Sequence, residues 1–338
     1  MHAPLQVIVP NNYAFKKRSD WKDWDDDFMR ATLQYHILQD MVDMPSIPKG
    51  DSITYPTLLT NKTYTNITGG QHVILTKQPG GQVVLTSGLA ERGTVEIEDV
   101  PYSGGLIQVV DTVMMVPKRL ESTARDSYKE MTAFLGALYA ADIVGEFADM
   151  PDVTLFIPRN AAFQHLAGAF AHMDDKTIRR ILHYHLFFGG VHHTWELQNG
   201  TVLTSAEKND VTVIRHNNYI FVNSAQIVTT DILLANGIVH IIDNVLSPME
   251  PDARPNVTAT AQPPVITPTG KTQVGTGVDV PFTTNLPCTA FCPEEPETST
   301  STQSTRRSTG TNVAPSRCTG MVNNVGLGLV IGAMAVAL

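Results

Sequence analysis

The sequence predicts an α+β protein with two similar domains in tandem and a carboxyl-terminal tail of a different composition. Three observations lead to this prediction. Short segments of the first part of the chain recur in the same order further on. Each copy has helix signals first and β-hairpin signals after them. Beyond the second copy, Thr, Ser and Pro replace the large apolar residues.

Three paired segments define the two copies. Their offset of roughly 130 to 150 residues is too long for a solenoid of short repeats and indicates duplicated domains. The paired segments are residues 6–15 with 154–163, 33–36 with 182–185, and 105–113 with 237–245. We therefore place the first domain at residues 1–120 and the second at residues 121–250.

The second copy begins with a strand and two helix signals. Residues 153–157 have the composition of a short buried strand that stops at Pro158. Asn160 is expected to cap the helix that follows the strand. Asp174 and Asp175 precede a further helix, because three apolar residues after them share one helix face. These residues are Ile178, Ile181 and Leu182.

Each copy then has the pattern of a β-hairpin. In the second copy, residues 211–215 and 219–222 flank Asn217-Asn218, and asparagine tolerates the positive φ that a tight turn needs. In the first copy, residues 72–76 and 82–86 flank a Pro-Gly-Gly turn. Helices followed by hairpins in both copies predict the α+β class.

Two more helical regions are expected ahead of these hairpins. Residues 128–147 have helical spacing, and their apolar face is formed by Phe134, Leu135, Leu138 and Ile143. A run of aspartates at positions 20, 23 and 25–27 opens a helix predicted at residues 28–41, where carboxylates near the amino end are favourable. The run lacks the glycine and the distal glutamate of an EF-hand loop, so we interpret it as a solvated segment.

Charge and cysteine content exclude several classes of function. A net charge of -9 over 338 residues argues against a nucleic-acid partner, because phosphate binding needs clustered Lys and Arg. The cysteines Cys288, Cys292 and Cys318 lie outside the predicted domains and are too few for a structural zinc site. Cys288 and Cys292 could form a disulfide in an oxidising compartment, which the sequence leaves open.

No catalytic site is predicted. The sequence contains no Gly-x-Ser-x-Gly elbow, no P-loop and no dinucleotide fingerprint, and no pair of carboxylates stands out as acid and base. Histidines are frequent between residues 165 and 193, but His183 and His185 are two positions apart and would lie on different faces of a helix. We therefore expect no catalytic residue, no cofactor and no metal.

The repeated segments resemble the FAS1 (fasciclin-like) family over both predicted domains. The second copy has the family's strand–turn motif at residues 154–163 and its strand motif at residues 237–246, which includes Asp243. Between them lies the Tyr-His pair at a helix end, Tyr184-His185. The equivalents in the first copy are Tyr35, His36 and Asp111. The first copy begins inside its first motif, for which a truncated amino terminus is our explanation.

The resemblance implies a non-enzymatic protein of the cell surface, acting in adhesion or in contact with the cell wall or matrix. Its partners would be cell-surface, wall or matrix proteins or glycans, and a surface binding module for a polysaccharide or lipid is the alternative. Some animal relatives bind integrins around the Tyr-His pair, so the motif residues could contact a ligand. In the interpretation that we favour, the pair is buried and its polar atoms bond to the backbone.

Four N-glycosylation sequons lie near predicted turns or linkers and favour a secreted product. Their asparagines are Asn61, Asn66, Asn199 and Asn256. No basic segment followed by an apolar one is visible at the amino terminus, so no secretory signal is predicted there.

The tail has the composition of a stalk followed by an anchor signal. Residues 251–324 are rich in Thr, Ser and Pro, and we expect them to form a disordered, O-glycosylated stalk. Residues 325–338 are apolar and uncharged but shorter than the roughly 20 residues of a membrane-spanning helix. This is the pattern of a GPI-attachment signal, with Asn312 preferred over Gly310 and Ser308 as the attachment residue. The predicted location is the extracellular face of the plasma membrane or the cell wall.

Overall fold

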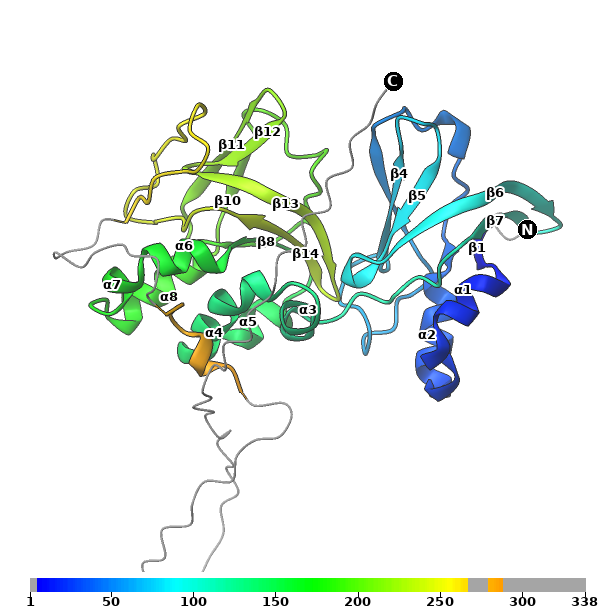
Figure 1. Cartoon of the computed structure of the whole chain (residues 1–338), viewed down its shortest axis with the longest axis horizontal. Helices are drawn as coiled ribbons and strands as arrows, with labels where there is room; N and C mark the ends of the chain where they lie inside the picture. The colour runs from blue at the N-terminus through cyan, green and yellow to red at the C-terminus, as the bar shows by residue number, and fades with distance from the viewer. Residues whose placement is uncertain (1–4, 267–278, 288–338) are drawn as a thin grey trace, which may run out of the picture.

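The computed structural model describes residues 5–266 and 279–287 of the chain. Figure 1 shows two lobes, one from blue to cyan and the other from green to yellow, joined by the segment between β7 and α3. In this view the helices of both lobes lie on the same side of their sheets. Each lobe corresponds to one predicted domain.

The first domain has a seven-stranded sheet in the order β2-β1-β7-β6-β5-β4-β3. Strand β1 runs parallel to β7, and the other neighbouring pairs are antiparallel. The strands are β1 (Leu5–Pro10), β2 (Ile37–Leu38), β3 (Ser52–Pro56), β4 (His72–Lys77), β5 (Val83–Thr86), β6 (Arg92–Tyr102) and β7 (Gly105–Val110). The helices are α1 (Asn12–Lys17), η1 (Ser19–Asp23), α2 (Asp26–Tyr35), η2 (Met44–Ser46) and η3 (Gly88–Ala90).

The second domain repeats this topology. Its sheet has the order β9-β8-β14-β13-β12-β11-β10, with β8 parallel to β14. The strands are β8 (Val153–Pro158), β9 (Leu186–Phe187), β10 (Val202–Thr204), β11 (Asp210–His216), β12 (Tyr219–Val222), β13 (Ala225–Leu234) and β14 (Gly237–Ile242). The helices are α3 (Leu120–Asp126), η4 (Lys129–Met131), α4 (Thr132–Ala140), α5 (Val144–Ala148), α6 (Asn160–His165), α7 (Ala167–Phe170) and α8 (Asp175–His183). Strand-by-strand agreement confirms the duplication.

A glycine is the first residue of β7 and of β14, because each of these strands closely approaches its parallel neighbour there. Gly105 pairs with Leu5, and Gly237 pairs with Val153. A Cβ at Gly105 would lie 1.8 Å from the Leu5 carbonyl oxygen, and one at Gly237 would lie 1.9 Å from that of Val153. Only glycine fits at these two positions.

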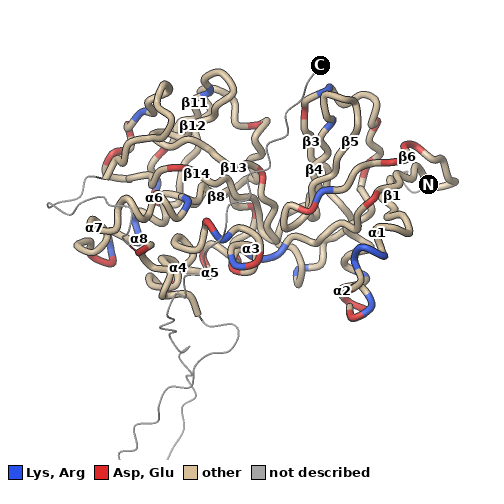
Figure 2. Tube along the Cα trace, viewed as in Figure 1, with Lys and Arg blue, Asp and Glu red and all other residues tan. Residues whose placement is uncertain are grey.

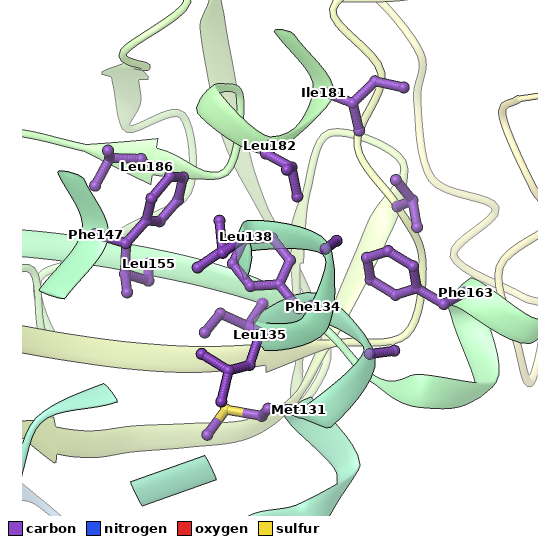
Figure 3. Packing of buried hydrophobic residues seen from close by; sticks show 14 of the residues in the cluster. Met131, Phe134, Leu135, Leu138, Phe147, Leu155, Phe163, Ile181, Leu182 and Leu186 are labelled. Atoms are coloured by element: carbon purple, nitrogen blue, oxygen red, sulfur yellow. The ribbon is translucent and has the colours of Figure 1, made fainter. Parts of the chain in front are cut away.

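The core of the second domain lies between its sheet and its helices. Figure 3 shows Phe134 and Leu138 of α4 in the middle of this cluster, with Leu182 of α8 nearby. The Phe134 ring meets Phe147 edge-on at 5.7 Å and Phe163 at 6.3 Å. The helical region predicted at residues 128–147 is therefore confirmed, and it is divided into η4, α4 and α5.

Two details of the predicted helices were wrong. The helix expected at residues 28–41 ends at Tyr35, because β2 follows immediately and pairs with β1. Asn160 is not the cap but the first residue of α6, and its Oδ1 accepts a hydrogen bond from the Ala133 amide at 2.8 Å. Asp174, by contrast, caps α8 by accepting from the Thr177 amide at 2.7 Å.

The predicted disordered stalk does not begin at residue 251. Residues 251–266 and 279–287 pack against the second domain, where Ile266 joins the hydrophobic core. The Phe282 ring lies 6.2 Å from Phe163 and 5.4 Å from Phe170. The few apolar residues of this Thr- and Pro-rich segment cover the helices, which the overall composition did not indicate. Cys288, Cys292, Asn312 and residues 325–338 lie outside the described residues.

Candidate functional site

The Tyr-His pair of the second domain connects α8 to the segment that follows β14. The Leu246 amide donates to His185 Nε2 at 3.0 Å, and His185 Nδ1 lies 2.7 Å from the Ile181 carbonyl oxygen. Since Nε2 accepts, Nδ1 must carry the proton. The Tyr184 hydroxyl donates to the Asp210 carbonyl at 2.9 Å and so reaches β11.

The first domain has the same arrangement. His36 Nε2 accepts from the Met114 amide at 3.0 Å, and its Nδ1 lies 2.7 Å from the Thr32 carbonyl oxygen. The Tyr35 hydroxyl donates to the His72 carbonyl at 2.8 Å. The backbone bonds that we expected for a buried pair are thus present in both copies.

Burial dominates the electrostatics of both pairs. His36 is 4% and His185 0% exposed, and burial lowers the pKa of each imidazole to about 4. Burial also raises the pKa of Tyr184 to about 12 and that of Tyr35 further. Both histidines are therefore neutral at physiological pH and form part of the core of their domains.

The motif aspartates Asp111 and Asp243 also bond to the backbone. Asp111 Oδ1 accepts from the Thr94 amide, and Asp243 Oδ1 accepts from the Gln226 amide, each at 2.7 Å. In the second domain the other oxygen, Asp243 Oδ2, accepts from the Gln262 amide at 3.1 Å. This bond ties residues 251–266 to the sheet.

A loop that only the first domain has docks onto the second domain. Thr57 and Ser205 occupy equivalent places, since each hydroxyl donates to a carbonyl that closes its loop, at Gln71 and Asn209 respectively. Residues 58–70 thus replace the short turn at residues 206–208. The longer loop reaches the second domain and docks there.

The docking is made by hydrogen bonds across the domain boundary. The Asn66 amide donates to the Ala235 carbonyl at 2.6 Å, and the Thr68 amide and hydroxyl donate to the Asp152 carboxylate at 2.7 and 2.5 Å. Gln71, which is fully buried, donates from Nε2 to a carbonyl of β13 at 3.0 Å. Such a set of satisfied bonds fixes the orientation of one domain relative to the other.

Apolar and aromatic contacts lie beside these bonds. Ile74 of β4 packs against Leu233 and Ile238 of the second domain. The rings of His72 and His193 lie 5.7 Å apart across the boundary. Burial lowers the pKa of His72 to about 4, and the neighbouring His193 adds to this effect.

An irregularity of β13 shapes the second domain's side of the boundary. Asp231 has a φ of 58° where the register between β13 and β14 shifts. Its carboxylate accepts from the Thr194 amide at 2.9 Å and from the Thr194 hydroxyl. Burial would raise its pKa, but His193, 3.8 Å away, and the Thr194 donors lower it to about 2. The aspartate is therefore ionised and holds the segment that contains Trp195.

A groove of about 510 Å³ runs between the domains beside this carboxylate. Asp51 and Ser52 line it from the first domain, and Trp195, Arg215 and Asp231 line it from the second. A second hollow of about 250 Å³ continues it, because both share Ser52, Thr230 and Asp231. Domain boundaries are a common place for ligand sites, so this groove is the candidate site. Sequence reasoning missed it.

The four sequons differ in their surroundings. Asn61, Asn199 and Asn256 are exposed. Asn66 is part of the domain boundary, where its Nδ2 donates to the Asp149 carbonyl at 2.7 Å. A sugar attached to Asn66 would therefore compete for space with the docked domain.

Charge and metal-ligand patterns add no further site. Figure 2 shows Lys and Arg scattered over both domains and interleaved with Asp and Glu. Within residues 5–266 and 279–287, no three His, Cys, Asp or Glu side chains are grouped so that they could hold a metal ion. In the same ranges, no helix has the length and apolarity needed to cross a membrane.

The sequence comparison assigns the family. The model of the Fasciclin domain matches residues 2–117 and 129–248, and the chain therefore belongs to the Fasciclin domain family. This domain is a non-enzymatic adhesion fold. Its two matched regions cover the two seven-stranded sheets and, except for α3, their helices.

Curated relatives match this chain over more than half of its length. The chain is 30% identical to a fasciclin-like arabinogalactan protein of Arthroderma benhamiae over 70% of this chain and 55% of the relative. It is 31% identical to the fasciclin-like arabinogalactan protein CTB11 of Cercospora beticola, over 58% of this chain and 53% of that protein. The chain thus spans about half the length of these relatives. One similar solved structure is a FAS1 domain pair from the insect cell adhesion molecule Fasciclin I. The match covers 74% of this chain and 90% of the chain in that structure, with 16% sequence identity and a TM-score of 0.38.

Proposed function

We propose that this chain is a non-enzymatic cell-surface protein that adheres to cell-wall or matrix partners through its two fasciclin domains. The observation that carries the proposal is the docked domain pair. Hydrogen bonds from residues 66, 68 and 71 hold the domains together, so loops of both can face one partner. A fixed composite surface loses less freedom on binding than two independent domains would.

The contacts of the Tyr-His pairs support a structural role for the family motif in this chain. Their polar atoms are occupied by backbone partners, and neither histidine offers appreciable surface. Adhesion would therefore depend on loops and on the boundary between the domains. These are the parts in which the two copies differ.

The location is part of the same proposal. A GPI anchor attached at Asn312 would tether the protein to the extracellular face of the plasma membrane or to the wall, and glycans at the exposed sequons would suit that environment. The fungal relatives named as fasciclin-like arabinogalactan proteins support a surface location. Phospholipase C treatment of expressing cells should release the protein, and retention of Leu338 in the mature chain would exclude the anchor.

Adhesion can be tested with beads that carry the purified full chain. The beads should bind to intact cells or to isolated wall material more strongly than beads coated with albumin or with the heat-denatured chain. Binding at the level of these controls would contradict the proposal.

A polysaccharide ligand is the second candidate, and the groove between the domains favours it over a lipid. The groove is lined by carboxylates, hydroxyls, a guanidinium group and one indole, whereas a lipid site would need a mostly apolar lining. An array of polysaccharides and lipid vesicles probed with the full chain separates these two ligands.

A further inference from the structure

We infer that the groove between the domains binds a neutral oligosaccharide, with Trp195 as its stacking platform. This inference rests on the proposed surface function and names the ligand class and the site. The groove and its continuation have volumes of about 510 and 250 Å³. The volume of the groove itself lies within the range of about 300–1,000 Å³ that is typical of a small-molecule site.

Trp195 is held in place by the fold rather than by a ligand. Its ring stacks on His193 with a centroid distance of 4.6 Å and an angle of 3° between the planes. His193 is 2% exposed, so it forms a fixed base on one face of the indole. The indole also packs against the apolar cluster of Ile74, Leu233 and Ile238, and Trp195 lines the groove with the surface that these contacts leave. A fixed aromatic face beside polar groups suits a sugar ring, which has an apolar face and a polar rim.

The segment around the indole is rigid. Arg215 Nε donates to the Leu197 carbonyl at 2.6 Å, and its Nη2 donates to the Thr194 carbonyl. Asp231 binds the amide and hydroxyl of Thr194 from the other side. The Trp195 segment is therefore fixed on both sides before any ligand arrives, which reduces the entropy lost on binding.

Groups able to bond to sugar hydroxyls remain along the groove. Asp51 and Thr230 are exposed, and their side chains make no hydrogen bond within the described part of the chain. They lie on opposite domains, so one oligosaccharide could contact both walls. Carboxylates accept hydrogen bonds from hydroxyls, and the threonine hydroxyl can donate or accept.

The charges in the groove select a neutral sugar over an acidic one. Asp51 and Asp231 contribute two carboxylates, while Arg215 contributes one guanidinium group that already donates to two backbone carbonyls. A uronic acid or a sulfated sugar would bring further negative charge next to these carboxylates. Glucose, mannose or galactose units carry no charge and would not be repelled by these carboxylates.

Calorimetric titration of the full chain with neutral and acidic oligosaccharides tests the inference. The neutral probes are short oligomers of glucose, mannose and galactose, and the acidic probe is an oligogalacturonide. At least one neutral series should bind, and binding should weaken at least tenfold in the Trp195→Ala variant. The acidic probe should bind at least tenfold more weakly than the neutral series.

Two further variants separate loss of the site from loss of the fold. Thr230→Arg fills the groove from an exposed position without breaking a hydrogen bond of the described structure, so it should abolish neutral-sugar binding at an unchanged unfolding midpoint. Tyr219→Ala removes a 53% exposed aromatic residue elsewhere on the second domain and should bind like the parent chain. Neutral-sugar binding that survives both Trp195→Ala and Thr230→Arg would overturn the inference, as would preferential binding of the acidic probe.

Failure of the inference about the groove can be distinguished from failure of the adhesion proposal. If beads carrying the chain adhere to wall material but no neutral oligomer binds, the inference about the groove is wrong and adhesion stands. If neutral oligomers bind in the groove but the beads do not adhere, the site is confirmed and the adhesion proposal is wrong.

Discussion

Acid should destabilise both domains through the buried histidines of the Tyr-His pairs. In each domain the neutral ring donates from Nδ1 to a helix carbonyl and accepts at Nε2 from a backbone amide, of Met114 in one and Leu246 in the other. Protonation at Nε2 removes the acceptor and leaves a charge in the core. Burial accordingly lowers the pKa of His36 and of His185 from 6.5 to about 4.

The size of the effect follows from this difference in pKa. Between pH 6.5 and about 4 the unfolded chain binds more protons than the folded chain, so stability is fully present above pH 6.5 and falls as the pH decreases towards 4. With 1.36 kcal/mol per pKa unit, each histidine removes about 2 kcal/mol from the free energy of unfolding at pH 5. The loss approaches about 3 kcal/mol below pH 4. That is a large fraction of the stability of a small domain.

Two measurements check this prediction. The free energy of unfolding of each domain, from urea denaturation, should be lower at pH 5.0 than at pH 7.5 by at least about 2 kcal/mol. Proton NMR of the histidine rings should show that His36 and His185 do not titrate above pH 5 in the folded chain. In urea, the histidine resonances should titrate near pH 6.5.

The reasoning is refuted if either ring titrates near pH 6.5 in the folded chain. Equal stability at the two pH values would refute it as well. Burial also lowers the pKa of His72 to about 4 and that of His240, so a loss larger than the two motif histidines explain is compatible with the argument.

Three more outcomes are expected. In thermal unfolding, Gly237→Ala should destabilise the second domain by about 3 kcal/mol or more, because the new Cβ would lie 1.9 Å from a carbonyl oxygen of β8. Gly80→Ala is the control and should be nearly neutral, because a Cβ at Gly80 would meet open space. Gln71→Leu removes a buried bond between the domains and should weaken their coupling by about 1–3 kcal/mol, seen in calorimetry as two separated transitions; one unchanged transition would contradict this. Glycopeptide mass spectrometry of the secreted chain should find Asn66 less occupied than the exposed Asn61, since the Asn66 amide nitrogen donates across the domain boundary, and equal occupancy would contradict the docked arrangement.

The sequence was sufficient for several elements that a local pattern decides. The two hairpins and the helix that follows Asp174 depend on neighbouring residues, and they are confirmed, as is the duplicated order of elements. The backbone bonding of the Tyr-His pairs followed from the general cost of burying an unpaired polar group. The helix end at Tyr35 was not predictable in this way, because pairing of β2 with β1 overrides the helical pattern.

The groove and the domain boundary could not be predicted from the sequence, because they depend on how two domains are oriented. Thr68 and Gln71 have no periodic pattern, and Asn66 was interpreted as a surface sequon because its local sequence says nothing about the second domain. The same holds for Ile266 and Phe282, which are isolated apolar residues in a segment of disorder-like composition. Their partners are distant in the sequence, so no local signal identifies them.

The interface also explains why a duplicated chain need not be symmetric in function. If both copies had the short turn of residues 206–208, the contacts of Asn66 and Thr68 with the second domain would be missing. The loop at residues 58–70 supplies those contacts only in the first domain. The second domain supplies the indole and the Asp231 carboxylate. One copy therefore provides the docking element and one wall of the groove, and the other provides the opposite wall with the stacking platform, so a single domain expressed alone would contain only part of the site.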